Sequence, residues 1–105
     1  MDDKPAIIAN ISSILGSVEL TDAGVAAAYK ISKAAVNMVN KLTAVEYKDK
    51  VAVSIHPGWV QTDMGGANAH ITPQQSVQGI LQLLSNIQLS DNGKFFDYQG
   101  AQLAF

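Results

Sequence analysis

The residues best suited to chemistry in this 105-residue chain are Tyr29 and Lys33, which lie four positions apart in the segment YKISK at residues 29–33. In a helix, that spacing places both side chains on one face, one turn apart. An ammonium group near a phenol favours the phenolate form, and an activated phenol can give or take a proton at a carbonyl or alcohol oxygen. The pair therefore indicates proton transfer coupled to carbonyl reduction or alcohol oxidation.

Two serines, Ser12 and Ser13, follow the first apolar run of the chain. A serine hydroxyl there could donate a hydrogen bond to the same substrate oxygen and stabilise the charge that develops on it. Each feature taken alone also has a plainer interpretation. The Tyr29 and Lys33 pair fits a solvated helix face, and the two serines fit a turn or a helix cap.

Three short runs predict the strands that would position these groups. Ala6–Ile11 and Val51–Ile55 have the length and β-branched content of buried strands, and 94–98 is the expected third strand. The second run is followed by His56, Pro57 and Gly58, which predict its end because proline removes a donor from the sheet.

Two helices are predicted between the strands. The stretch from Ala26 to Lys50 contains no Gly or Pro, and apolar residues recur in it at steps of four and three. A second helix is expected to begin at Thr72, with Pro73 at its first position and Gln75 placed for a capping box. The apolar face of the first helix consists of Ile31, Ala35, Met38, Leu42 and Val45, and that of the second of Val77, Ile80, Leu81, Leu84 and Ile87.

The alternation of strand and helix predicts an α/β fold with a parallel sheet and right-handed crossovers. In such sheets, ligands bind beyond the carboxyl ends of the strands, which here are the segments after Ile11, Ile55 and Phe96. Three strands are few, however, for a sheet type that normally has both faces covered.

Composition narrows the class of protein. The net charge is −2 and all seven cations are lysines, which disfavours a nucleic-acid partner. The chain has no cysteine, no signal-peptide pattern at its start and no apolar run of membrane-spanning length, so a cytoplasmic protein without a membrane partner is expected. His56 and His70 are 14 residues apart without a matching carboxylate pattern, so no metal site is predicted.

The order of three motifs is more specific than any one of them. SSILG at 12–16, YKISK at 29–33 and PGWVQT at 57–62 resemble, in this order, the C-terminal half of the short-chain dehydrogenase/reductase family. The stretch HPGWVQTDMGG at 56–66 is particularly similar to the carbonyl reductase-like members. The resemblance covers nearly the whole chain.

The resemblance implies a role for each motif. Tyr29 would be the catalytic acid/base, Lys33 would favour its deprotonated form and bind the nicotinamide ribose, and Ser13 would position the substrate carbonyl. The cofactor would be NADP or NAD, with NADP favoured, and the substrate a small carbonyl compound or alcohol. The nicotinamide ring would be lined by Pro57, Gly58, Val60 and Thr62.

The family's N-terminal half has no counterpart here, since no glycine-rich pyrophosphate turn follows a strand. We therefore expect residues 1–105 to form a single partial domain, the C-terminal part of a Rossmann-like doubly wound parallel sheet whose N-terminal βαβ units are absent. The isolated chain is expected to be inactive. The alternative is a non-catalytic protein that acts as an interaction or self-association module, and a homo-oligomer is open under either interpretation.

Overall fold

The structure of the protein is a computed structural model, and it describes residues 5–61 and 69–105. Strands and helices alternate along the chain, as the sequence predicts. The elements are β1 (Ile7–Ile11), the short 3-10 helix η1 (Ile14–Gly16), α1 (Ala27–Glu46), β2 (Val51–His56), α2 (Pro73–Ser85), the 3-10 helix η2 (Leu89–Asp91) and β3 (Phe95–Asp97).

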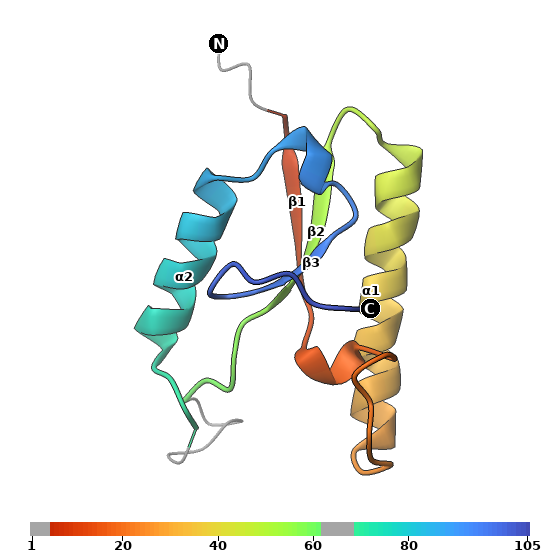
Figure 1. The fold of residues 1–105 in the computed structure, drawn as a ribbon, viewed down its shortest axis with the longest axis vertical. Helices are drawn as coiled ribbons and strands as arrows, with labels where there is room; N and C mark the ends of the chain where they lie inside the picture. The colour runs from red at the N-terminus through yellow and green to blue at the C-terminus, as the bar shows by residue number, and fades with distance from the viewer. Residues whose placement is uncertain (1–4, 62–68) are drawn as a thin grey trace.

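The described strands form one parallel sheet in the order β1-β2-β3. Ile8 of β1 pairs with Ala52 of β2, and Ile55 of β2 pairs with Phe96 of β3. Helix α1 lies on one face of this sheet and α2 on the other (Figure 1). The prediction of an α/β fold built on a parallel sheet is confirmed, and it corresponds to the C-terminal part of a Rossmann-like sheet.

The core lies around the central strand β2. Its alternate residues Val51, Val53 and Ile55 are fully buried and pack with Ile87 and Phe96. Because successive side chains of a strand point to opposite faces, these three share one face. Helix α2 and its C-terminal end cover this face with Ile80, Leu83 and Leu84.

The start of α2 agrees with the sequence prediction in each detail. The Thr72 hydroxyl accepts a hydrogen bond from the Gln75 backbone N–H at 3.2 Å, and the Gln75 side-chain oxygen accepts one from the Thr72 N–H at 2.8 Å. Pro73 occupies the first helical turn, where its missing N–H costs nothing. The capping box fixes where the chain turns into this helix.

Helix α1 forms within the predicted stretch but differs from the prediction on its surface. It spans Ala27–Glu46, 20 residues, and ends before the last residues of the stretch without Gly or Pro. Its predicted apolar face is exposed, with Met38 at 60% and Leu42 at 62%, because nothing in the described part of the chain covers it. The face that packs on the sheet carries the buried residues Asn37, Asn40 and Ala44.

The strands also differ slightly from their predicted bounds. β1 begins at Ile7, β3 spans only Phe95–Asp97, and β2 includes His56, because its pairing with Asp97 extends the ladder up to Pro57. Among the described residues, no helix has both the length and the hydrophobicity needed to cross a membrane.

Candidate functional site

The carboxyl end of β1 and the first turns of α1 are joined by hydrogen bonds. The backbone N–H of Ser12 donates to the Ile55 carbonyl at 2.7 Å, which continues the pairing of β1 with β2. The buried Ser12 hydroxyl donates to the backbone carbonyl of Lys33 at 3.4 Å. The serine pair and the Tyr29–Lys33 helix face, 21 residues apart at this bond, therefore meet at one end of the sheet.

Tyr29 and Lys33 lie together as their spacing predicts. The Lys33 ammonium nitrogen is 5.7 Å from the centre of the Tyr29 ring, within the range of a cation–π contact. The same nitrogen is 3.5 Å from the carbonyl oxygen of Ile11, the last residue of β1. Tyr29 is 37% exposed, so its phenol is accessible to a small molecule.

Ser13 is placed by the short helix that follows it. It is the N-cap of η1, and its hydroxyl oxygen accepts a hydrogen bond from the Leu15 N–H at 3.1 Å. A serine hydroxyl has one proton to donate in addition to its acceptor capacity. Because Oγ acts as the acceptor here, this bond does not use the Ser13 proton, and the residue as a whole is 7% exposed. The helix-cap interpretation and the functional one are thus compatible.

The η1 turn is also anchored to α1. The Asn37 side-chain amide donates to the Gly16 carbonyl at 3.3 Å, and the Gly16 N–H donates to the Ser13 carbonyl at 2.9 Å. Sequence reasoning did not assign Asn37 any function. Its position one turn after Lys33, on the same helix face, was the available signal.

The loop before α1 is held by main-chain acceptors. Lys30 reaches back to donate to the Ala23 carbonyl at 2.6 Å, and Thr21 donates to the Ser17 carbonyl at 2.6 Å. Helix α1 has no side-chain cap, and Ala26 adopts a left-handed conformation (φ 57°) at its start. This loop leads directly into the turn that carries Tyr29.

The predicted nicotinamide-lining segment leaves the carboxyl end of β2. The Pro57 carbonyl accepts a hydrogen bond from the buried Ser76 hydroxyl of α2 at 2.6 Å. Gly58 has a positive φ of 88°, and Val60 pairs with Ile71 in an isolated parallel bridge. Three of the four predicted lining residues therefore lie at the expected end of the sheet. Thr62 lies outside the described residues.

His56 is a residue of this region that the sequence analysis did not assign to the site. Its ring nitrogen Nδ1 accepts a hydrogen bond from the backbone N–H of Ile14 at 3.0 Å, across 42 positions of sequence. Burial lowers the pKa of His56 below 6.5, and the charge of Asp97 opposes this effect in part. The lowered pKa favours the neutral ring, which is the form that can accept this bond.

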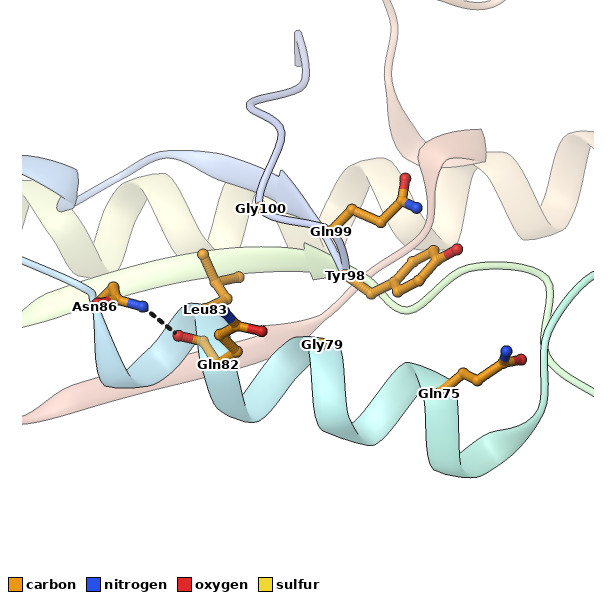
Figure 2. Close-up of a pocket in the computed structure, with 8 residues that line it drawn as sticks. All are labelled: Gln75, Gly79, Gln82, Leu83, Asn86, Tyr98, Gln99 and Gly100. Carbon is orange, nitrogen blue, oxygen red and sulfur yellow. Dashed lines mark hydrogen bonds between the residues drawn. The ribbon is translucent and has the colours of Figure 1, made fainter.

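A separate pocket of about 490 Å³ lies between α2 and the turn that follows β3 (Figure 2). It contains neither the serine pair nor the Tyr29–Lys33 face, and amide side chains surround it. Among the described residues that line it, Tyr98 is the one ionisable group, so these residues offer no pair of groups for acid–base work. The lining residues are Gln75, Gly79, Gln82, Leu83, Asn86, Tyr98, Gln99 and Gly100.

Comparison with known proteins identifies the family. The model of the short chain dehydrogenase family matches residues 1–72. C-signal of Myxococcus xanthus is 40% identical over 98 residues, which cover 91% of this chain and 59% of that protein.

Solved structures agree with this match. Carbonyl reductase Sniffer of D. melanogaster superposes with a TM-score of 0.93 at 38% identity, covering 99% of this chain and 44% of that one. The NADPH-bound carbonyl reductase from chicken fatty liver gives a TM-score of 0.86 at 40% identity, over 95% of this chain and 43% of that one. The chain thus covers 59% of the length of C-signal, 44% of Sniffer and 43% of the chicken enzyme. Its sequence and its fold both show that the chain belongs to the short-chain dehydrogenase/reductase family, among the carbonyl reductase-like members.

Proposed function

We propose that this chain is the C-terminal, catalytic part of an NAD(P)-dependent oxidoreductase that reduces a small carbonyl compound or oxidises the corresponding alcohol. The observation that carries the proposal is the meeting of Tyr29, Lys33 and the serine pair at the carboxyl end of β1. An acid/base, a cation beside it and a hydroxyl donor are the groups that proton transfer at a carbonyl oxygen requires.

Each side chain has a distinct task in this proposal. The Tyr29 phenol gives its proton to the carbonyl oxygen during reduction and takes it back during oxidation. The Lys33 ammonium, 5.7 Å from the centre of the phenol ring, places a positive charge beside the group that exchanges the proton. The Ser13 hydroxyl donates a hydrogen bond to the same oxygen. It can do so because the bond from the Leu15 N–H uses Oγ as an acceptor and leaves the hydroxyl proton for another partner.

Ser13 suits this task better than Ser12. The Ser12 hydroxyl donates its proton to the Lys33 carbonyl, so it is engaged in holding α1 to the strand end. The Ser13 proton has no such acceptor among the described residues. This difference agrees with the choice of Ser13 from the family resemblance.

The residues present fit the nicotinamide end of a dinucleotide. The Lys33 ammonium has three donors, and the acceptor it reaches, the Ile11 carbonyl, is at the outer limit of a hydrogen bond, so donors are left for ribose hydroxyls. Pro57, Gly58 and Val60 would lie along the ring. A bound nicotinamide dinucleotide supplies the hydride. The NADP bound to solved relatives supports NADP as the form used.

The adenosine end has no such residues in this sequence, because it lacks a glycine-rich turn between a strand and a helix. We therefore propose that residues 1–105 correspond to one part of a larger dinucleotide-binding domain, and that the isolated chain turns over carbonyl substrates negligibly. Measurable NADPH-dependent reduction by the purified chain, abolished by Tyr29→Phe, would contradict this statement.

A chimaera tests the catalytic proposal directly. Residues 5–105 would replace the corresponding C-terminal part of the chicken carbonyl reductase, and NADPH oxidation would be followed with a set of aldehydes and ketones. We expect turnover, and we expect Tyr29→Phe to lower kcat by about 100-fold or more.

The chain supplies a matched control for this substitution. Tyr47 also lies beside a lysine, since the Lys50 ammonium is 5.4 Å from its ring, but it stands at the opposite end of α1. Tyr47→Phe should leave kcat unchanged. Equal effects of the two substitutions, or an active Tyr29→Phe chimaera, would refute the role of Tyr29.

A further inference from the structure

His56 connects the end of β2 to the turn that presents Ser13. Its Nδ1 accepts the Ile14 N–H at 3.0 Å, and Ile14 is the first residue of η1, directly after Ser13. One residue further along the turn, the Leu15 N–H donates to the Ser13 hydroxyl at 3.1 Å. The imidazole and the Ser13 hydroxyl thus accept the N–H groups of two consecutive residues of one short turn.

The turn depends on such acceptors because a helix start leaves N–H groups without intrahelical partners. Ser13 satisfies the N–H of Leu15, and His56 satisfies that of Ile14. A three-residue 3-10 helix has little stability of its own. The orientation of the Ser13 side chain is therefore set by groups outside the turn as well as within it.

The bond from Ile14 also fixes the chemical form of the ring. A nitrogen that accepts a hydrogen bond carries no proton, so the neutral ring must hold its proton on Nε2. Protonation of Nδ1 would replace an acceptor with a second donor facing the Ile14 N–H. Asp97, the register partner of His56 on β3, is the charged group that acts on the ring.

We propose that His56 is a positioning residue for Ser13: its neutral Nε2–H tautomer accepts the Ile14 N–H and thereby fixes the turn that orients the Ser13 hydroxyl. The effect of His56 on catalysis rests on the proposed function, because it requires Ser13 to bind the substrate oxygen. The structural link between His56 and Ser13 can be tested without any activity.

The first test uses nuclear magnetic resonance on the full 105-residue chain. Imidazole nitrogen shifts report the tautomer, and hydrogen exchange at the Ile14 and Leu15 amides reports the two bonds. We expect the Nε2–H form at neutral pH. In His56→Phe, we expect about tenfold faster exchange at both amides, as for the loss of one hydrogen bond. In His56→Asn, which keeps an acceptor oxygen near the Nδ1 position, we expect near-normal exchange.

A substitution at Ile14, the donor of the hydrogen bond to His56, distinguishes loss of this bond from general misfolding. Ile14→Pro removes the donor, and proline is well tolerated at the first helical position, where the extended Ser13 backbone (φ −156°, ψ 150°) is the conformation favoured before proline. If His56 acts through the Ile14 N–H, His56→Phe should have no further effect on the Leu15 amide in this background.

The effect of His56 on catalysis is measured as kcat and KM of the chimaera. A misplacement of about 1 Å can cost about 100-fold in rate, so His56→Phe should lower kcat by about 10- to 100-fold with little change in KM for NADPH, and His56→Asn should restore it.

The proposal is overturned by an Nδ1–H tautomer, by an unchanged Leu15 amide in His56→Phe, by an equal defect in Phe and Asn variants, or by an unchanged kcat. A chimaera that is inactive with His56 in place counts against the proposed function instead, and the amide measurements then decide the role of His56.

Discussion

Gly16 lies directly against the backbone of Lys33: a β-carbon at position 16 would stand 2.7 Å from the Lys33 carbonyl carbon and 2.9 Å from its Cβ. Real β-carbons do not approach other atoms so closely. The turn that carries Ser13 can therefore lie against the helix that carries Tyr29 only because position 16 has no side chain. The glycine of the Ser-Ser-x-x-Gly motif has a steric function in the site.

Gly16→Ala should separate the turn from α1. The nearest atoms are the Lys33 carbonyl group and Cβ, which cannot move without the helix backbone, so we expect the free energy of unfolding to fall by about 1–3 kcal/mol, as for overpacking in a core. The measurement is urea denaturation. Gly24→Ala is the control, because no atom of the described residues lies within 4 Å of its β-carbon position. A Gly16→Ala chain as stable as the Gly24→Ala chain would show that the contact tolerates a methyl group.

The titration of His56 predicts how stability changes with pH. The pKa of His56 in the folded chain is lowered from 6.5 by burial, with the charge of Asp97 acting in the opposite direction. Below about pH 6.5 the unfolded chain then binds more protons than the folded chain, so the free energy of unfolding falls as the pH falls. The loss is complete once the pH is below the folded pKa, and above about pH 6.5 this group contributes no slope.

Urea titrations at several pH values would measure this effect, and His56→Asn is the matched variant because it removes the titrating group but keeps an acceptor. The variant should show a smaller loss of stability toward acid pH than the natural chain. His70 is unchanged between the two chains, so the difference between them reports position 56. Parallel pH profiles for the two chains would be inconsistent with a lowered pKa of His56.

The accuracy of the sequence predictions depends on how local each signal is. The start of α2 is set by Thr72, Pro73 and Gln75, which are close neighbours in the chain, and the structure shows the full capping box. The bond from Ile14 to His56 spans 42 positions, and the contact of Gly16 with Lys33 depends on how η1 packs on α1. No pattern within one segment encodes such contacts.

Helix α1 shows a different limit. The spacing of Met38 and Leu42 correctly predicts a helix, but hydrophobic periodicity cannot tell which polypeptide covers the apolar face. The face that contacts the sheet instead contains Asn40, which accepts a hydrogen bond from Asn10 of β1 at 2.9 Å. Two asparagines 30 positions apart give no signal of this pairing in a single sequence.

The capping box of α2 makes a quantitative prediction. Thr72→Ala leaves the Gln75 N–H without its acceptor and should lower the free energy of unfolding by about 1 kcal/mol. Gln78→Ala changes an exposed glutamine within the same helix and should have a much smaller effect, since alanine is a good helix former. Comparable losses for both variants in chemical denaturation would mean that the cap contributes little.

A position can require glycine because its φ is positive or because a β-carbon would not fit, and a comparison of Gly58 with Gly100 distinguishes these two reasons. Both have a positive φ, 88° and 89°, so an alanine at either position is strained. At Gly58 the added carbon would also collide, because it would lie 2.6 Å from the Ile71 Cδ1 and 3.0 Å from a carbon of the Tyr98 ring. At Gly100 no atom of the described part of the chain lies within 4 Å. Gly58→Ala should therefore destabilise the chain more than Gly100→Ala.

The nearest collision partner at Gly58 is the end of a flexible side chain and can be removed, whereas the Tyr98 ring atoms at 3.0 and 3.1 Å stay in place. Gly58→Ala in an Ile71→Val background lacks the nearest methyl group, and there the cost of Gly58→Ala should fall part of the way toward that of Gly100→Ala. Urea denaturation of Gly58→Ala, Gly100→Ala and the double variant, with the natural and Ile71→Val chains as parents, gives this comparison. If the cost of Gly58→Ala is the same with isoleucine or valine at position 71, the Ile71 methyl group contributes nothing to it, and the positive φ and the Tyr98 ring account for the requirement for glycine.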